Sequence, residues 1–237
     1  MNKWSRRGFI GAGLLTGGAL VVGVAIRPGN AVDKLRGSVA GGEGEQLVNA
    51  WVKIDRDNTV TAIVPHCEMG QGAHTTLAQM LADELDADWA KVSVMQAPAD
   101  GNYVVPDAAR DFVAAWSLDA PKWLESTYNG LFTQISKLGD VLVTGGSSSV
   151  RTTGQHTMRL AGAAARQMLV AAAAARWNVP ASEIVAENST LVHKASNKRG
   201  TYGEFAEAAS QESMPQTPPL KDVSQYKLMG KGLQRFD

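Results

Sequence analysis

The stretch that most constrains the fold is residues 47–64, where two apolar runs rich in β-branched residues are separated by a short polar turn. The first run is 47–54 and the second is 59–64. Between them lies Asp55-Arg56-Asp57-Asn58, a set of residues that favours tight turns because Asp and Asn side chains hydrogen-bond to nearby backbone. Two such runs around a turn predict a β-hairpin, and we expect this hairpin to begin a sheet.

A helix is expected soon after the hairpin. Beyond a glycine-rich turn, residues 74–85 carry apolar side chains at helical spacing: Leu77, Met80, Leu81 and Leu85. The same pattern places a set of acidic residues on the outer face of this helix: Asp83, Glu84, Asp86 and Asp88. Residues 92–95 then read as a short strand.

The second half of the chain mixes helices and strands. Periodicity is weak over 102–143, where aromatic and leucine residues around Trp116 and Trp123 indicate one or two helices. Residues 153–177 are rich in alanine and predict a long, mostly buried helix. Two short strands, 184–186 and 190–193, and a helix over 202–209 capped by Thr201 complete the pattern. We therefore expect an α+β fold, a mixed sheet with packed helices.

The N-terminus has the features of a twin-arginine export signal. Arg6 and Arg7 precede 19 uncharged residues, 8–26, and small residues follow at the expected cleavage site after Ala31. An uncleaved signal that tethers the chain to a membrane, or a membrane-spanning helix, stays open beside cleavage. Because this route carries folded proteins, we expect a periplasmic redox protein that receives its cofactor before export.

Four segments follow from these patterns. We expect a signal peptide at 1–31, a glycine-rich linker at 32–45, the main domain at 46–212, and a proline-containing connector toward a missing domain at 213–237. The chain carries 23 basic and 23 acidic residues and has no basic run with interleaved aromatics, so nucleic acid is not expected as a partner. Its single cysteine, Cys67, excludes an internal disulfide and a cysteine-ligated metal cluster within this chain. We expect Cys67 to be a small packed residue.

Two glycine motifs have the composition of anion-binding turns. In the first, Gly70, Gln71 and Gly72 lie between a strand and a helix, where backbone N–H groups and the helix dipole favour a phosphate. In the second, Gly145 and Gly146 precede Ser147, Ser148 and Ser149 at the start of the long helix. Neither motif has the spacing of a Walker A loop or a dinucleotide fingerprint, so ATP and NAD are not expected. An ordinary strand-to-helix turn is the open alternative for each.

Taken together, the two motifs resemble a known family. The chain has Glu68-Met69-Gly70-Gln71-Gly72, then Leu85-Asp86, then Gly145-Gly146-Ser147-Ser148-Ser149 and Gly154-Gln155, all behind a twin-arginine signal. In this order they resemble the molybdopterin-binding subunits of the xanthine dehydrogenase and aldehyde oxidase family, and within it the isoquinoline 1-oxidoreductase beta subunit type. The resemblance extends over nearly the whole chain, and it implies that the α+β fold is part of a larger molybdopterin-binding architecture.

This resemblance implies a function and a set of contacts. It assigns cofactor contacts to Gly70, Gln71, Gly72, Ser147, Ser148 and Ser149. Arg151, Thr152 and Gln155 are adjacent polar residues that we add as further contacts. It implies a molybdopterin-type molybdenum cofactor, with the dinucleotide form left open, in a hydroxylase that oxidises aldehydes or N-heteroaromatics with water-derived oxygen. Iron-sulfur clusters would belong to a small partner subunit, and a periplasmic cytochrome c would be a further electron acceptor.

The chain also departs from the family. Its members are much longer and carry a catalytic glutamate near the C-terminus, which we do not find here. Glu43 and Glu45 lie in the linker, and Glu68 is expected to accept hydrogen bonds from its turn rather than act as a base. His66 and His74 do not have metal-ligand spacing and are expected to be satisfied structurally. We assign no catalytic and no metal-binding residue, and we expect the chain alone to be inactive. A non-catalytic truncated fragment or an exported binding module is the alternative.

Overall fold

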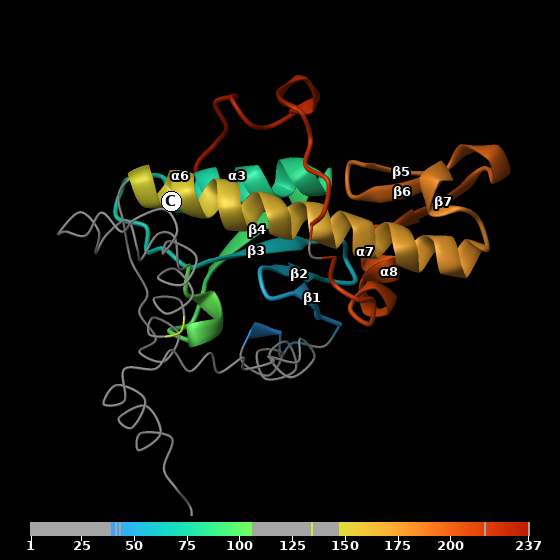
Figure 1. Cartoon of the computed structure of the whole chain (residues 1–237), viewed down its shortest axis with the longest axis horizontal. Helices are drawn as coiled ribbons and strands as arrows, with labels where there is room; N and C mark the ends of the chain where they lie inside the picture. Colours follow the sequence, from blue (N-terminus) through green and yellow to red (C-terminus); the bar gives the residue numbers. More distant parts are fainter. Residues whose placement is uncertain are drawn as a thin grey trace, which may run out of the picture. The chain divides into compact units, whose positions relative to one another are not determined.

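The computed structural model describes residues 39–40, 42, 44–105, 134, 147–215 and 217–236. The described part of the chain is a mixed sheet covered by long helices, with a smaller second sheet at one end (Figure 1). The α+β class predicted from the sequence is confirmed. The predicted signal peptide and the helices predicted around Trp116 and Trp123 lie outside the described residues.

The first sheet has the order β1-β2-β3-β4, with strands β1 (Gln46–Asn49), β2 (Val52–Ile54), β3 (Val60–Val64) and β4 (Val92–Gln96). The predicted hairpin forms between β2 and β3, which are antiparallel with Ile54 opposite Val60. The first predicted run is two strands rather than one. It breaks because the Asn49 side chain accepts the backbone N–H of Trp51 at 2.9 Å, a local turn that competes with a continuous strand.

Helix α3 (Ala73–Leu85) connects β3 to β4, which lie parallel, so these elements form a β-α-β unit. This helix was predicted, as was β4. Alternate side chains of β3 point to opposite faces of the sheet. Val60, Ala62 and Val64 face the main core with the helices, while Ile63 packs in a second cluster with Leu47 and Tyr103.

The long predicted helix begins earlier than expected and contains an irregular turn. Helix α6 (Ser147–Thr153) leads through a π-helical turn (η3, Gly154–Met158) into helix α7 (Arg159–Trp177). Two glycines allow this unit to lie close to α3. A Cβ at Gly154 would collide with the Met80 side chain, and a Cβ at Gly162 would collide with the backbone carbonyl of Leu81.

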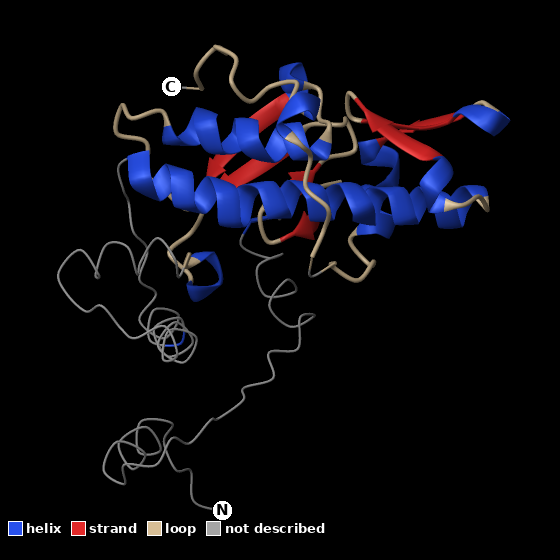
Figure 2. Cartoon of the chain, turned by 45° about the horizontal axis from the view of Figure 1, so that its top comes forward, coloured by secondary structure: helices blue, strands red, loops and turns tan. Residues whose placement is uncertain are grey.

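Helices α3 and α7 lie side by side over the sheet, as Figure 2 also shows. The core between helices and sheet is mostly aliphatic and alanine-rich. Among its fully buried members are Leu77, Leu81, Leu85, Met158, Leu169, Tyr202 and Phe205. Three tryptophans pack on aromatic partners: Trp51 on Tyr103, Trp89 on Phe236 and Trp177 on Phe205.

The second sheet has the order β5-β6-β7, all antiparallel, with strands β5 (Ile184–Glu187), β6 (Thr190–His193) and β7 (Lys198–Thr201). The sequence predicted β5 and β6 but not β7. Helix α8 (Tyr202–Ala209) follows, and Thr201 caps it in a capping box with Glu204, as predicted. The remaining short turns are Trp89–Lys91, Gly101–Tyr103, Ala181–Glu183, Lys194–Ser196 and Val223–Gln225. Within the described ranges, no helix is both long and apolar enough to cross a bilayer.

The acidic residues of α3 were predicted on its outer face, and this prediction is wrong for most of them. The residues Asp83, Glu84 and Asp86 are 1%, 0% and 9% exposed. They are buried because the segment from Lys221 to Met229 lies over them and binds their carboxylates, together with Arg159 on Glu84. This segment was predicted as a connector, and that role stays a prediction.

Candidate functional site

The loop between β3 and α3, residues 65–72, carries the first glycine motif. Gly70 and Gly72 have φ angles of 93° and 76°, in the left-handed region where only glycine is free of strain. Gly72 is the N-cap residue of α3, and its own carbonyl accepts the N–H of Thr76 at 3.0 Å. The two glycines therefore fix the shape of the loop and the direction in which its backbone donors point.

The loop donors converge on one anionic group, the carboxylate of Glu68. One oxygen accepts the N–H groups of Gly70 and Gly72, both at 2.9 Å, and the other accepts the N–H of His74 at 3.1 Å. The prediction that Glu68 serves its own turn as a hydrogen-bond acceptor is confirmed. Converging N–H groups at a helix N-terminus form an anion-binding nest, and here a side chain of the same loop fills it.

The amide of Gln71 is also used within the loop. Its nitrogen donates to the Cys67 carbonyl at 2.7 Å and its oxygen accepts the N–H of Met69 at 2.5 Å. The outer surface of the loop is formed in part by Met69, which is 66% exposed, and by Cys67. Cys67 was predicted to be packed, and this prediction is wrong because the loop turns its side chain outward.

The histidines at the glycine loop contact neighbouring elements. The His66 ring Nε2 lies 2.7 Å from the Thr153 hydroxyl at the end of α6. The His74 ring Nε2 lies 2.9 Å from the His66 carbonyl and 3.2 Å from the Gln96 amide oxygen. Both histidines are thus structurally satisfied, as predicted: His66 links the glycine loop to helix α6, and His74 links it to strand β4.

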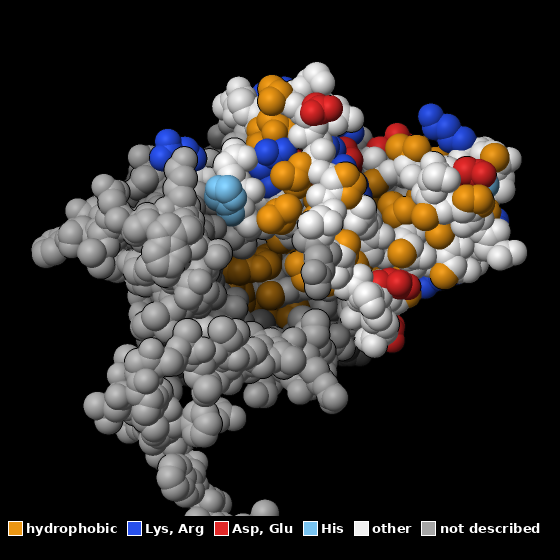
Figure 3. Space-filling view, in the orientation of Figure 1, with side chains coloured by type: hydrophobic (Ala, Val, Ile, Leu, Met, Phe, Trp, Pro, Cys, Tyr) orange, Lys and Arg blue, Asp and Glu red, His pale blue; other side chains and the backbone are white. Residues whose placement is uncertain are grey.

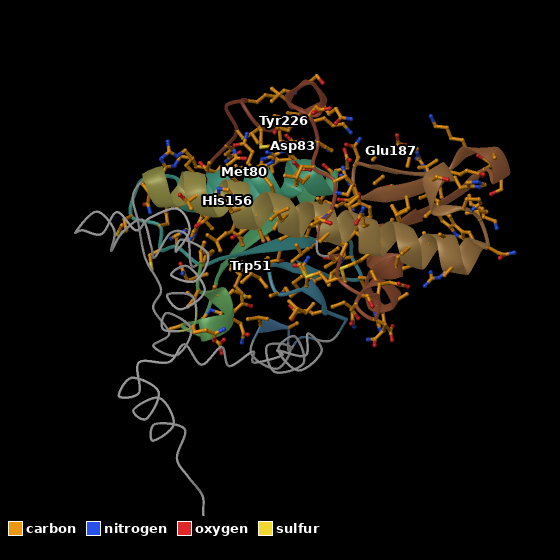
Figure 4. All side chains as sticks on the ribbon, in the orientation of Figure 1. Trp51, Met80, Asp83, His156, Glu187 and Tyr226 are labelled. Carbon is orange, nitrogen blue, oxygen red and sulfur yellow. The ribbon has the colours of Figure 1, made fainter. Side chains whose placement is uncertain are left out.

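The second motif has a different local structure from the one expected. Ser147, Ser148 and Ser149 form the first turn of α6 rather than a loop before it. Arg151 is exposed on the same helix, and the Gln155 side chain accepts a hydrogen bond from Arg159 at 2.9 Å. The π-helical turn that follows contains His156 and packs against Met80 of α3 (Figure 4). The serine turn therefore belongs to a helix that contacts α3.

A polar stripe on α3 binds the C-terminal segment, residues 219–236, which runs antiparallel to the helix. The stripe consists of Asp86, Asp83, Gln79 and Thr75, which follow one another at helical spacing. Asp83 accepts the N–H groups of Lys227, Leu228 and Met229 at 3.0, 3.1 and 2.8 Å. Further toward the glycine loop, the Gln79 amide donates to the Lys231 carbonyl at 3.0 Å and the Thr75 hydroxyl accepts the N–H of Phe236 at 3.0 Å.

Buried ion pairs strengthen this docking. The Arg159 guanidinium donates to Glu84 at 2.6 and 2.8 Å, and Glu84 also accepts the N–H of Lys221 at 3.0 Å. Asp86 pairs with Lys221 at 2.8 Å and with Lys227 at 2.6 Å. Burial alone would raise the pKa of Asp86, but hydrogen bonds from the two lysines and their charges outweigh it and lower the pKa.

Other clusters in the described residues do not form a second centre. No group of three or more His, Cys, Asp and Glu side chains in these ranges could hold a metal ion. His193 lies between Ser196, at 2.7 Å, and Glu183, at 2.8 Å, and ties the turn after β6 to the turn before β5. A hollow of about 580 Å³ lies between β1 and α8, lined by Arg56, Arg176, Glu204 and Glu207 among others. Figure 3 shows basic, acidic and apolar side chains interspersed over the visible face.

Comparison with known proteins agrees with the resemblance. The molybdopterin cofactor-binding domain family matches residues 17–106, a span that includes the glycine loop and α3. The isoquinoline 1-oxidoreductase subunit beta of Brevundimonas diminuta is 33% identical over 90% of this chain and 23% of its own length. The membrane-bound aldehyde dehydrogenase [pyrroloquinoline-quinone] of Gluconacetobacter polyoxogenes is 31% identical over 95% of this chain and 25% of its own length.

A solved structure, the quinoline 2-oxidoreductase from Pseudomonas putida 86, matches 69% of this chain and 17% of its own with a TM-score of 0.41 and 18% identity. The chain thus spans about a quarter of the length of its curated relatives. What the comparisons show for this chain is a molybdopterin cofactor-binding domain match over residues 17–106. The resemblance expected from the sequence is confirmed to this extent: the chain is similar over most of its length to an isoquinoline 1-oxidoreductase beta subunit, and part of it matches a molybdopterin cofactor-binding domain.

Proposed function

We propose that the chain is the molybdopterin-holding part of a periplasmic molybdenum hydroxylase that oxidises aldehydes or N-heteroaromatic compounds with oxygen derived from water. The observation that carries this proposal is the match of residues 17–106 to a molybdopterin cofactor-binding domain, together with the glycine loop inside that span. The names of the two curated relatives support both substrate classes.

The loop suits an anionic cofactor by the chemistry of its donors. Three backbone N–H groups hold the Glu68 carboxylate, so the donors of this loop suit an anionic oxygen. A Cβ at Gly70 would meet no atom within 4 Å, so the outer side of the loop is open to a ligand. We assign the cofactor contacts to Gly70, Gln71, Gly72 and the turn of Ser147, Ser148 and Ser149.

When bound, the molybdenum cofactor supplies the redox centre that accepts two electrons and delivers a water-derived oxygen to an electron-poor carbon. This chain binds and orients that group. Glu68 and Gln71 hold the loop in shape, and the His66 to Thr153 hydrogen bond links the loop to helix α6. We assign no proton transfer to any residue of this chain. Electrons would leave through a small iron-sulfur partner subunit, because one cysteine cannot ligate such clusters, and then through a cytochrome c.

One observation favours a second candidate, a non-catalytic fragment or exported binding module. All three converging N–H groups are satisfied by Glu68, so the loop is stable without any ligand. This candidate predicts a stable chain that takes up no pterin.

Isotope labelling tests the proposed reaction. The chain, purified with its associated subunits, is given an aldehyde or an N-heterocycle, an artificial electron acceptor and ¹⁸O-labelled water. The proposal expects ¹⁸O in the product and no turnover by the isolated chain. Product formed with unlabelled oxygen, or turnover by the isolated chain, would contradict it.

The proposed export is tested separately. Replacing Arg6 and Arg7 with lysine keeps the charge but removes the twin-arginine pair, so the protein should remain in the cytoplasm. Unchanged recovery from the periplasm would refute the assignment. Fractionation with intact mass distinguishes a cleaved signal from a membrane tether.

A further inference from the structure

A phosphate bound at the glycine loop would need a positive charge close by. Its three converging N–H groups are occupied by the carboxylate of Glu68, which is 12% exposed at its side chain. A phosphate placed beside this loop therefore approaches a negative charge. Binding becomes favourable only if a cation stands close to both groups.

Arg235 occupies such a position. Its guanidinium lies 3.7 Å from a Glu68 oxygen and 3.5 Å from the Gly70 carbonyl oxygen. Its side chain is 47% exposed, so part of the guanidinium faces solvent at the loop. A guanidinium has five N–H donors in a planar fork, and it can keep contacts to the loop while it donates to phosphate oxygens.

The backbone around Arg235 is held in place by helix α3. The polar stripe described above guides the C-terminal segment along the helix, and the N–H of Phe236 donates to Thr75 in the first turn of α3 at 3.0 Å. The Phe236 ring lies 5.1 Å from the Trp89 ring. Arg235 therefore reaches the loop although it lies more than 160 residues away in sequence. Its neighbour Phe236 is anchored on α3, the helix that follows the loop.

We propose that Arg235 is a cofactor-binding residue that contacts a phosphate oxygen of the molybdopterin cofactor at the glycine loop. This inference rests on the proposed function and adds a residue to the site. It assigns the C-terminal segment a share in cofactor binding and gives the stripe of α3 the role of positioning that segment.

Cofactor content of charge variants tests this inference. R235Q, R235K and K231Q are expressed in the native host, purified with their associated subunits, and dialysed for equal times. Molybdenum is measured by mass spectrometry and the pterin by fluorescence after oxidation. K231Q is the matched control because it removes the same charge from the same segment, while Lys231 binds Gln79 and Leu228 through its backbone.

Loss of a charge-assisted contact to phosphate weakens binding by about tenfold or more. We expect R235Q to retain about a tenth or less of the native cofactor, R235K to retain an intermediate amount and K231Q to match the native chain. Equal thermal midpoints of the cofactor-free proteins establish that R235Q folds. Native cofactor content in R235Q would overturn the inference and leave the proposed function intact. Absence of molybdenum and pterin from the native protein itself would overturn the proposed function and this inference with it.

Discussion

Replacement of Asp83 by asparagine should release the C-terminal segment from α3. The Asp83 carboxylate is 1% exposed and accepts three backbone N–H groups, those of Lys227, Leu228 and Met229. Asparagine keeps one carbonyl oxygen but presents an NH₂ group to the other donors. Hydrogen bonds to charged groups contribute about 1.5–3 kcal/mol each, and water replaces part of this when the segment opens. We therefore expect docking of the segment to weaken by about 2–4 kcal/mol.

Hydrogen exchange measures this change directly. A loss of about 2–4 kcal/mol raises the opening equilibrium on the order of 30- to 1,000-fold, so the three amides should exchange faster by that factor. Asp222→Asn is the matched control, since Asp222 is an exposed carboxylate in the same segment and asparagine also caps helical turns. This control should change the free energy of opening of the segment by less than about 0.5 kcal/mol. Native exchange rates at these amides in Asp83→Asn would refute the role we give to the buried carboxylate.

Three further predictions concern the loop, acid stability and helix packing. Glu68→Ala leaves three loop N–H groups without their acceptor. It should lower the free energy of unfolding by about 1–3 kcal/mol and speed hydrogen exchange at those amides. Unchanged exchange would contradict the role of Glu68 as the acceptor of the three groups. The folded pKa of Asp86 lies below its unfolded value, so its contribution is present at neutral pH and is lost as pH falls through about 4 and below. Acid titration of unfolding should thus be less steep in Asp86→Asn, and an identical slope would count against the pairing with Lys221 and Lys227. Gly162→Ala should destabilise the fold by about 1–3 kcal/mol or more because its Cβ meets the Leu81 carbonyl, whereas Gly232→Ala, where a Cβ meets no atom within 4 Å, should be neutral in the same thermal scan.

Much of the fold could be predicted because its signals are local. The hairpin between β2 and β3 depends on a four-residue turn, and α3 depends on leucines at helical spacing. The cap of α8 by Thr201 follows from two residues three positions apart. Strand β7 was missed because Lys198–Thr201 has no apolar alternation, and it forms through its pairing with β6.

The remaining differences arise from contacts between distant parts of the chain. The three acidic residues of α3 read as a solvated face because the segment that buries them follows about 140 residues later. The π-helical turn and the close approach of Gly154 to Met80 are not revealed by spacing within the helix. The burial of the carboxylates and the packing at Gly154 both involve distant partners that sequence periodicity does not identify.

The candidate site was predicted in part. The glycine loop, the acceptor role of Glu68 and the structural roles of His66 and His74 follow from residue types around a strand-to-helix turn. The place of the serines within α6 and the approach of Arg235 to the loop do not, because each depends on how far a helix or a docked segment extends. Arg235 can be identified as a candidate site residue only once the docking of its segment on α3 is known.

The most direct test of the account is the metal content of the chain recovered from the periplasm of its own host. Molybdenum and iron are measured per chain, together with the intact mass and the extracted cofactor. The account predicts near-stoichiometric molybdenum with a pterin in this chain and iron in a co-purifying subunit. A stable chain of the expected mass with neither molybdenum nor pterin, or one that yields pyrroloquinoline quinone instead, would contradict it.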